Sequence, residues 1–224
     1  YVNNFMERTI SVFDLTPLQT EGIAGLPLIA SVATLATDKL SATVLQGKRL
    51  FYDALDTRLA RDAYLSCASC HNDGGQDGRV WDLTGFGEGL RNTANLGGRA
   101  GAQGFLHWSN NFDEVQDFEG QIRGFAGGNG LMTNAEFNTG TRSQPLGDRK
   151  AGVSADLDSL AAYVASLSNF APSPLRNADG TLTAAAVAGR NVFISKNCSS
   201  CHGGTAFTTS AGNNPQDIGT IDAD

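Results

Sequence analysis

The chain has 224 residues, of which only 17% are charged, against about 25% in an average globular protein. Glycine supplies 27 residues, which predicts long loops and modest regular structure. The 16 basic and 23 acidic residues give a formal net charge of −7 without any run of Lys or Arg. We therefore expect no nucleic-acid partner, because phosphate binding requires a basic surface. The longest uncharged stretch, residues 22–37, is too short for a transmembrane segment and lacks the basic flank of a signal peptide.

Residues 1–40 are predicted to form a short β segment followed by a linker. Residues 1–14 are rich in β-branched and aromatic side chains, and Ile10 and Val12 alternate as in a strand. This stretch resembles the last strands of a YVTN-type β-propeller blade, which implies a chain fused to, or cut from, such a domain. A small β arm packed on the rest of the chain is the alternative interpretation. An isolated hairpin is only marginally stable in water, so both interpretations require a neighbour for these strands.

A first helical unit is expected over residues 41–175. Ser41 can cap a helix in which Val44, Leu50 and Phe51 place apolar side chains on one face. A second helix of this unit is expected over residues 154–167, which has a serine cap, acids in its first turn and apolar residues at helical spacing.

All four cysteines of the chain lie in two copies of one motif. The copies are Cys67-Ala-Ser-Cys70-His71 and Cys198-Ser-Ser-Cys201-His202. Two thiols at this spacing reach the two vinyl groups of one porphyrin, and the next residue presents an imidazole to the iron. The copies are too far apart for a paired zinc site, and neither has a thioredoxin-like βαβ context. The sequence therefore predicts two covalently attached haems c, with His71 and His202 as iron ligands.

A second unit is expected over residues 176–224. Prolines and turn residues mark residues 170–180 as a linker, and a helix over residues 183–196 leads into the second motif. The phrase Gly47-Lys-Arg-Leu-Phe of the first unit is echoed here by Gly189-Arg-Asn-Val-Phe. The stretch after the second motif is too short for a closing helix and a distant iron ligand. We therefore expect this unit to be incomplete within the sequence.

Four segments resemble the bacterial di-haem cytochrome c peroxidase and MauG-like family. They are Gly47-Lys-Arg-Leu-Phe-Tyr-Asp-Ala, Asp62-Ala-Tyr-Leu-Ser-Cys-Ala-Ser-Cys-His, Gly89-Leu-Arg-Asn-Thr-Ala-Asn-Leu and Leu106-His-Trp-Ser-Asn. The resemblance covers roughly residues 41–210 and both haem motifs. It implies a mostly α fold with two cytochrome c-like haem domains in tandem, long loops and a short N-terminal β segment.

The resemblance also carries expectations about the two sites. In the family one haem is peroxidatic and the other receives electrons, with a tryptophan between them that corresponds to Trp108. A glycine such as Gly47 lies where two helices of a c-type cytochrome cross, because the missing side chain lets the backbones approach. Covalent haem attachment implies a periplasmic or extracellular protein. Two haem propionates per haem add to the acidic surface, which favours basic redox protein partners.

The chain departs from the family pattern at three places: an iron ligand of each haem and the catalytic acid. The family loop that offers a distal histidine corresponds to residues 84–90, which contain none. The methionine that usually binds the second haem falls beyond residue 224. The catalytic acid that follows the tryptophan has no certain register here, and Glu114 and Glu119 are candidates only if the chain is a peroxidase.

His107 is the one histidine outside the motifs, and it is the candidate sixth ligand of the first haem. A structural histidine is the alternative, and Met132 is a less favoured ligand that otherwise fills the core. A bis-histidine haem suits electron transfer, whereas a five-coordinate haem beside a carboxylate can reduce peroxide. We expect electron transfer as the main activity, with hydrogen peroxide reduction, or a subunit of an extended multi-haem conduit in a larger assembly, as the alternatives.

Three further features carry weaker expectations. Arg91 can bind a haem propionate or lie at the surface, since guanidinium groups commonly pair with carboxylates. Trp108 is a haem-wall or core residue as readily as an electron relay. Residues 72–78 resemble a calcium loop but lack its ligand order and closing glutamate, so a solvated turn is favoured over a calcium site.

Overall fold

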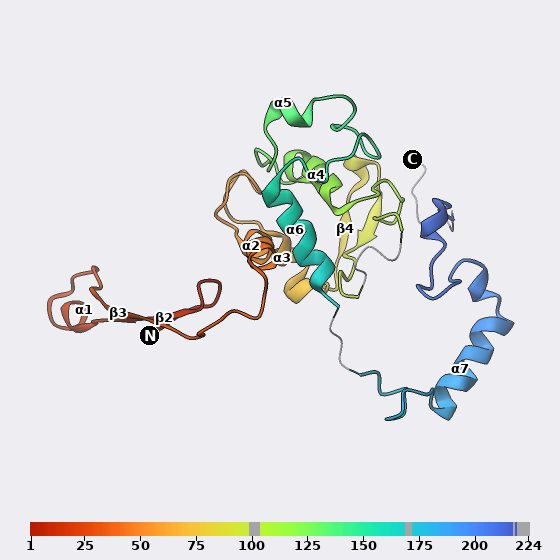
Figure 1. The fold of residues 1–224 in the computed structure, drawn as a ribbon, viewed down its shortest axis with the longest axis horizontal. Helices are drawn as coiled ribbons and strands as arrows, with labels where there is room; N and C mark the ends of the chain where they lie inside the picture. The colour runs from red at the N-terminus through yellow and green to blue at the C-terminus, as the bar shows by residue number, and fades with distance from the viewer. Residues whose placement is uncertain (99–103, 169–171, 217, 219–224) are drawn as a thin grey trace.

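The computed structural model describes residues 1–98, 104–168, 172–216 and 218. Three parts follow one another in the chain: an N-terminal β arm, a central body, and a C-terminal segment around helix α7 (Figure 1). The predicted linker and the glycine-rich stretch before His107 lie partly outside the described residues.

The arm is a three-stranded antiparallel sheet in the order β1 (Val2–Asn4), β2 (Thr9–Phe13), β3 (Leu28–Ala33), with the short helix α1 (Thr16–Glu21) between β2 and β3. The strands expected within residues 1–14 are confirmed, whereas β3 was not predicted. The arm touches the body through Glu7, which pairs with Arg49 at 3.2 Å, and through Phe5, whose ring lies 4.4 Å below the Lys48 ammonium.

The body is built around two crossing helices, α2 (Ala42–Tyr52) and α6 (Ala155–Ser166) (Figure 1). Both begin as predicted, because Ser41 accepts the Val44 N–H and Ser154 accepts the Leu157 N–H. The apolar faces of the two helices meet in the core. Its buried members are Leu50, Phe51, Leu59, Ile122, Met132, Leu157, Leu160 and Tyr163.

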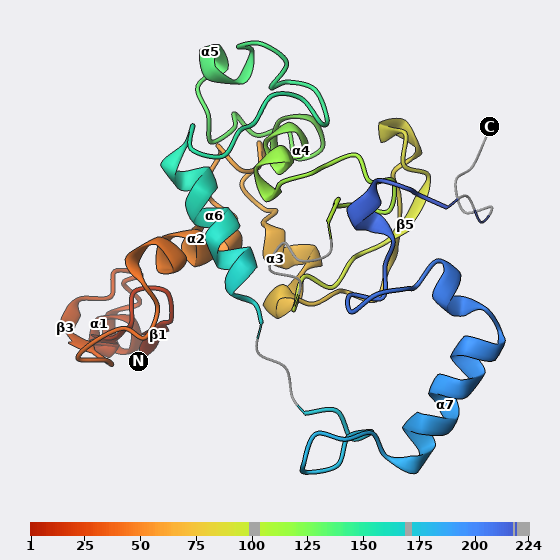
Figure 2. The same ribbon diagram turned by 45° about the vertical axis from the view of Figure 1, so that its right-hand side comes forward.

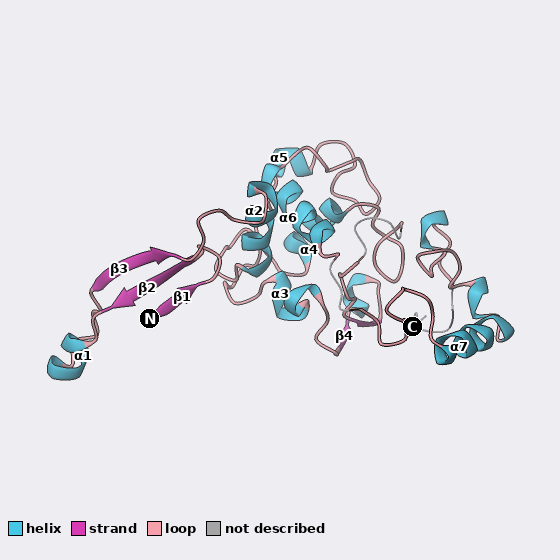
Figure 3. Cartoon of the chain, turned by 60° about the horizontal axis from the view of Figure 1, so that its bottom comes forward, coloured by secondary structure: helices cyan, strands magenta, loops and turns pink. Residues whose placement is uncertain are grey.

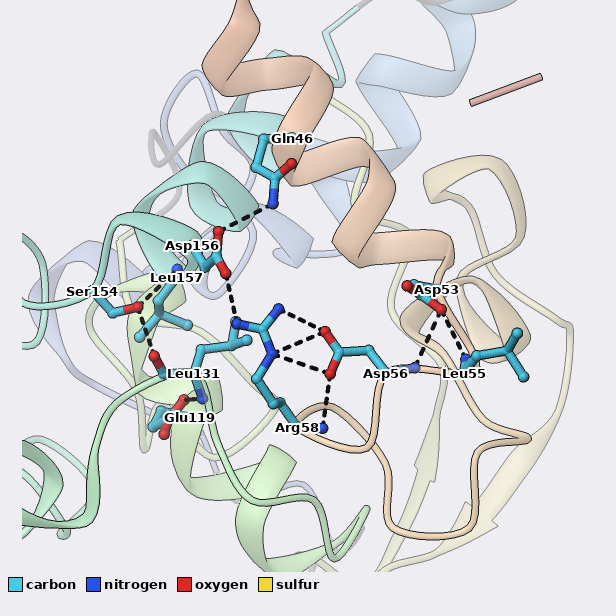
Figure 4. Close-up of polar contacts among 10 residues, drawn as sticks. All are labelled: Gln46, Asp53, Leu55, Asp56, Arg58, Glu119, Leu131, Ser154, Asp156 and Leu157. Carbon is cyan, nitrogen blue, oxygen red and sulfur yellow. Dashed lines mark hydrogen bonds and ion pairs between the residues drawn. The ribbon is translucent and has the colours of Figure 1, made fainter. Parts of the chain in front are cut away.

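A polar network ties the loop after α2 to both helices (Figure 4). The Arg58 guanidinium pairs with Asp56 at 2.7 Å and with Asp156 of α6 at 2.8 Å. Asp156 in turn accepts a hydrogen bond of 3.1 Å from Gln46 of α2. These bonds fix the rotation of the two helices about their contact.

Gly47 lies at the contact between the two helices, as the resemblance implied. A Cβ at this position would overlap the carbonyl oxygen of Ser159, so the backbones are in direct contact. Gly189, the corresponding glycine of the second unit, makes no such contact. A Cβ at Gly189 meets no atom within 4 Å among the described residues.

We expect Gly47→Ala to lower the free energy of unfolding by about 1–3 kcal/mol, because overpacking forces the backbones apart. Gly189→Ala is the matched control, and it should be neutral or stabilising by up to about 1 kcal/mol through helix propensity alone. Urea unfolding followed by circular dichroism measures both values. Equal effects at the two glycines would show that the crossing does not depend on Gly47.

The remainder of the body consists of loops, short helices and one hairpin. The helices are α3 (Cys67–Cys70), α4 (Glu119–Gly124) and α5 (Asn134–Phe137), and the hairpin pairs β4 (Val80–Asp82) with β5 (Leu90–Asn92). Of the residues that the structure describes, 34% are helical, so the expected mostly α fold is corrected to a mixed fold with small sheets. Loops dominate the view in Figure 3 because glycines with positive φ interrupt the regular elements.

The C-terminal segment contains α7 (Ala184–Ser195) and the second cysteine motif. Its helix begins at Thr183 as predicted, but none of its residues is buried. The segment curves back toward the body (Figure 2), where Ser210 Oγ donates to the Phe105 carbonyl at 2.6 Å. The division at residues 40 and 175 stays a prediction.

Candidate haem sites

The first cysteine motif is held in one helical turn after α2. Ser66 and Ser69 form a capping box at the start of α3, and the His71 N–H donates to the Cys67 carbonyl at 2.9 Å. Both thiols are free rather than joined in a disulfide. Burial raises the pKa of Cys67 to about 11, which keeps this thiol protonated at neutral pH.

All three histidines share one pattern of hydrogen bonding. Nδ1 of His71 lies 3.3 Å from the Gly75 carbonyl, Nδ1 of His202 lies 3.1 Å from the Phe207 carbonyl, and Nδ1 of His107 lies 2.7 Å from Oδ1 of Asn111. Each partner is an acceptor, so the proton belongs on Nδ1 and the lone pair on Nε2. This is the state in which histidine binds a metal, so the donor set fits a haem iron.

An open cavity of about 720 Å³ lies beside α3, within the range of roughly 300–1,000 Å³ for small-ligand sites. Its lining includes Ala68 and Ser69 of the motif and Trp81 of β4. Asp77, one of the two acids of the calcium-like loop and part of the lining of the same cavity, accepts hydrogen bonds from Trp81 at 3.0 Å and Thr93 at 2.7 Å. Among the described residues, no group of three or more His, Cys, Asp or Glu side chains is placed to hold a metal ion.

The His107 imidazole lies in an aromatic setting. Its ring centroid is 4.3 Å from that of Phe112 and 4.9 Å from that of Phe118. Burial lowers the pKa of His107, whereas the hydrogen bond with Asn111 and the charge of Glu88 raise it. The backbone of His107 has a φ of +63°, an uncommon value for a residue other than glycine.

The neighbouring candidates Trp108 and Arg91 differ in burial. The Trp108 side chain is exposed, at 62%, and its Nε1 donates to the Asn92 carbonyl at 3.0 Å. Arg91 on β5 is buried rather than at the surface, with its Nε 3.4 Å from Oε2 of Glu88. Roles of either residue toward a haem stay predictions.

Both acids expected to serve a peroxidase are engaged in bonds within the protein. Glu119 is fully buried and accepts from Arg123 at 2.7 Å, from the Leu131 N–H at 2.9 Å and from the Met132 N–H at 3.1 Å. The Glu114 carboxylate accepts the backbone N–H groups of residues 150 and 151. Their catalytic role remains a prediction, and Met132 lies in the core.

The carboxylate that does lie beside His107 is Glu88, which was not singled out from the sequence. Its residue exposure is 4%, and it accepts hydrogen bonds from Ser109 and Asn111. Gly87 and Gly89 flank it with φ of +77° and +66°, so the backbone can turn its side chain inward. A lone glutamate between two glycines was the available signal, but its partners are about twenty residues away in the chain.

The second motif forms a tighter turn. Residues Cys198–Ser200 are a 3-10 helix, and the His202 N–H donates to the Cys198 carbonyl at 2.9 Å. Phe207, whose carbonyl faces His202, packs edge-on against Phe193 of α7 at 5.9 Å. The two motifs thus share the local geometry of cysteines and histidine, although their surroundings differ.

A cysteine–cysteine–histidine turn against a pair of crossed helices is the arrangement of a c-type cytochrome. A family model described as di-haem cytochrome c peroxidase matches residues 41–191, most of the chain. The chain therefore belongs to the di-haem cytochrome c peroxidase family, which implies haem c as cofactor and haem-based redox activity.

The chain is similar to two hydrazine synthase proteins. Hydrazine synthase subunit gamma of Kuenenia stuttgartiensis is 32% identical over 146 residues, which cover 62% of this chain and 37% of that protein. A solved structure of hydrazine synthase from the same organism matches with a TM-score of 0.50 at 26% identity, over 78% of this chain and 54% of that one.

A third match is a MauG-like protein associated with microbial copper homeostasis. It is 20% identical with a TM-score of 0.45, over 79% of this chain and 54% of that one. The chain thus spans only about a third to a half of the length of the relatives that it matches.

We expect the double variant Cys67→Ser/Cys70→Ser to lose one of two covalently bound haems, since both thioether positions of the first site are removed. Intact-mass spectrometry and haem staining after denaturation measure the loss. Cys198→Ser/Cys201→Ser should lose the other haem. Two haems remaining on either variant would contradict the assignment of that motif.

Proposed function

We propose that this chain carries electrons between redox partners through two covalently bound haems, and that His71 and His107 bind the iron at the first site. Haem c supplies an iron that gains and loses one electron. The observation that carries the proposal is the His107 imidazole, which Asn111 fixes at Nδ1 and which packs against the rings of Phe112 and Phe118.

The surroundings of His107 suit a fixed ligand. Phe112 and Phe118 pack against its ring, and its side chain is only 18% exposed. An imidazole held in this way keeps its place in both oxidation states, which lowers the rearrangement that accompanies electron transfer. An iron held by both His71 and His107 would leave peroxide no site there.

Hydrogen peroxide reduction is the second candidate, because the family is named for that activity. It requires His107 to leave the iron and a carboxylate to assist O–O cleavage. All three candidate carboxylates, Glu114, Glu119 and Glu88, accept hydrogen bonds within the protein, and Glu88 lies 3.9 Å from Nδ1 of His107.

The proposal also includes the location of the protein and the kind of partner that it binds. Covalent haem attachment favours a periplasmic or extracellular location, and within the described residues no helix is long and apolar enough to cross a membrane. The net charge of −7 favours redox partners with basic patches. One relative is by name a subunit of hydrazine synthase, which supports a place for this chain in a larger assembly.

Two rates separate the candidates. Stopped-flow oxidation of the reduced protein by a basic cytochrome should be fast and should slow as the salt concentration rises, because charge steering is screened. Peroxide should be consumed no faster than by free haem. Peroxide turnover that depends on protein-bound haem, with slow and salt-independent electron exchange, would favour the peroxidase.

A further inference from the structure

A buried carboxylate stands behind His107, joined to it by one asparagine. Nδ1 of His107 donates to Oδ1 of Asn111 at 2.7 Å, and Nδ2 of Asn111 donates to Oε1 of Glu88 at 2.7 Å. Glu88 Oε1 lies 3.9 Å from Nδ1 of His107. The three side chains form a continuous chain of hydrogen bonds from the carboxylate to the imidazole.

The direction of each hydrogen bond in this chain is fixed by its neighbour. A carboxylate only accepts, so the Asn111 amide must present its NH₂ to Glu88 and its oxygen to His107. The imidazole must then carry its proton on Nδ1 and its lone pair on Nε2. The tautomer that binds a metal is therefore selected by Glu88, although Glu88 does not need to touch the metal.

The chain of bonds is also held rigidly in place. Ser109 donates a second hydrogen bond to Oε1 of Glu88, and Arg91 lies 3.4 Å from Oε2. The backbone between these groups is bent, with φ of +63° at His107 and +56° at Asn110. Backbone in this region is costly for residues other than glycine, and it persists where surrounding contacts impose it.

We propose that Glu88 and Asn111 are positioning residues for His107: Asn111 orients the imidazole, and the Glu88 charge makes it a stronger electron donor. This inference rests on the proposed function, in which His107 binds the iron of the first haem. Neither residue is a catalytic residue, since neither contacts the iron or a substrate.

Substitutions at Asn111 and at Glu88 should change different properties of the first haem. Asn111→Leu removes the bond to Nδ1, and we expect about a tenfold loss of ligation by His107, seen as a growing high-spin fraction of the oxidised first haem. Glu88→Gln keeps an acceptor for Asn111 but removes the charge. We expect it to stay low-spin while the first haem becomes about tenfold easier to reduce, a rise of about 59 mV in midpoint potential for one electron.

The measurements are electron paramagnetic resonance of the oxidised holoprotein and a spectroscopic redox titration. Asn129→Leu is the matched control for Asn111→Leu, because Asn129 is exposed and its side chain has no hydrogen bond among the described residues. Glu21→Gln is the control for Glu88→Gln, because it removes the same charge from the exposed arm. Circular dichroism and the haem content of each variant separate a change at His107 from loss of the fold.

His107→Ala, measured in the same way, separates failure of the proposed function from failure of the inference about Glu88 and Asn111. If His107→Ala leaves the first haem unchanged, the proposed function fails. If His107→Ala alters that haem while Asn111→Leu and Glu88→Gln match their controls, the proposed function stands and this inference is wrong. If Asn111→Leu does not fold, the potential of Glu88→Gln alone decides the inference.

Discussion

His107→Ala is expected to open one binding site for carbon monoxide at the first haem of the reduced protein. The unaltered protein should bind no carbon monoxide at that haem. In the proposed site His107 would hold the iron, and alanine would leave that place open. The visible difference spectrum with carbon monoxide measures the number of sites. Loss of the low-spin signal from the oxidised first haem should accompany the change.

Free imidazole provides the control for His107→Ala. Because the cavity left by the ring is walled by Phe112 and Phe118, added imidazole should enter it and restore the low-spin signal. Carbon monoxide binding to the unaltered chain at the first haem, with no increase in the variant, would contradict the assignment of His107.

Lys150→Ala is expected to lower the free energy of unfolding by about 3–5 kcal/mol. Lys150 and Asp117 form an ion pair in which both side chains are 2% exposed. Asp117 also accepts the backbone N–H groups of Asp113 and Glu114, which shape the turn before α4. Removing the ammonium leaves a buried charge without its partner, and this cost is as large as that of a core truncation.

The double variant Lys150→Met/Asp117→Asn tests the cause of that loss. It removes both charges and keeps the volume, so it should be more stable than Lys150→Ala alone. Urea unfolding gives both values. If the double variant is as unstable as the single one, the unpaired charge does not account for the effect.

The parts of the fold that could be predicted from sequence depend on local signals. Ser41, Ser154 and Thr183 each cap a helix within three residues of themselves, and all three helices begin there. The two cysteine motifs are local in the same sense, because each turn is set by a few adjacent residues. Gly47 was placed at the helix crossing by the family resemblance, since its partner Ser159 is far away in the chain.

Contacts between segments that are far apart in the sequence could not be predicted, and the helix content was predicted too high. Glu88 meets Ser109 and Asn111 only because the loop after β4 folds onto the loop that carries His107. Strand β3 pairs with β2 across an intervening helix, and its residues are all exposed, so no alternation of burial marks it. The helix content was overestimated because the glycine-rich segments between α2 and α6 form turns and short strands around the first motif.

Low-temperature electron paramagnetic resonance of the oxidised holoprotein tests whether His71 and His107 both bind the iron at the first site. In protein with ¹⁵N-labelled histidine, we expect a low-spin first haem coupled to two histidine nitrogens, one of which disappears in His107→Ala. A high-spin first haem coupled to a single histidine nitrogen, the same in both proteins, would contradict it.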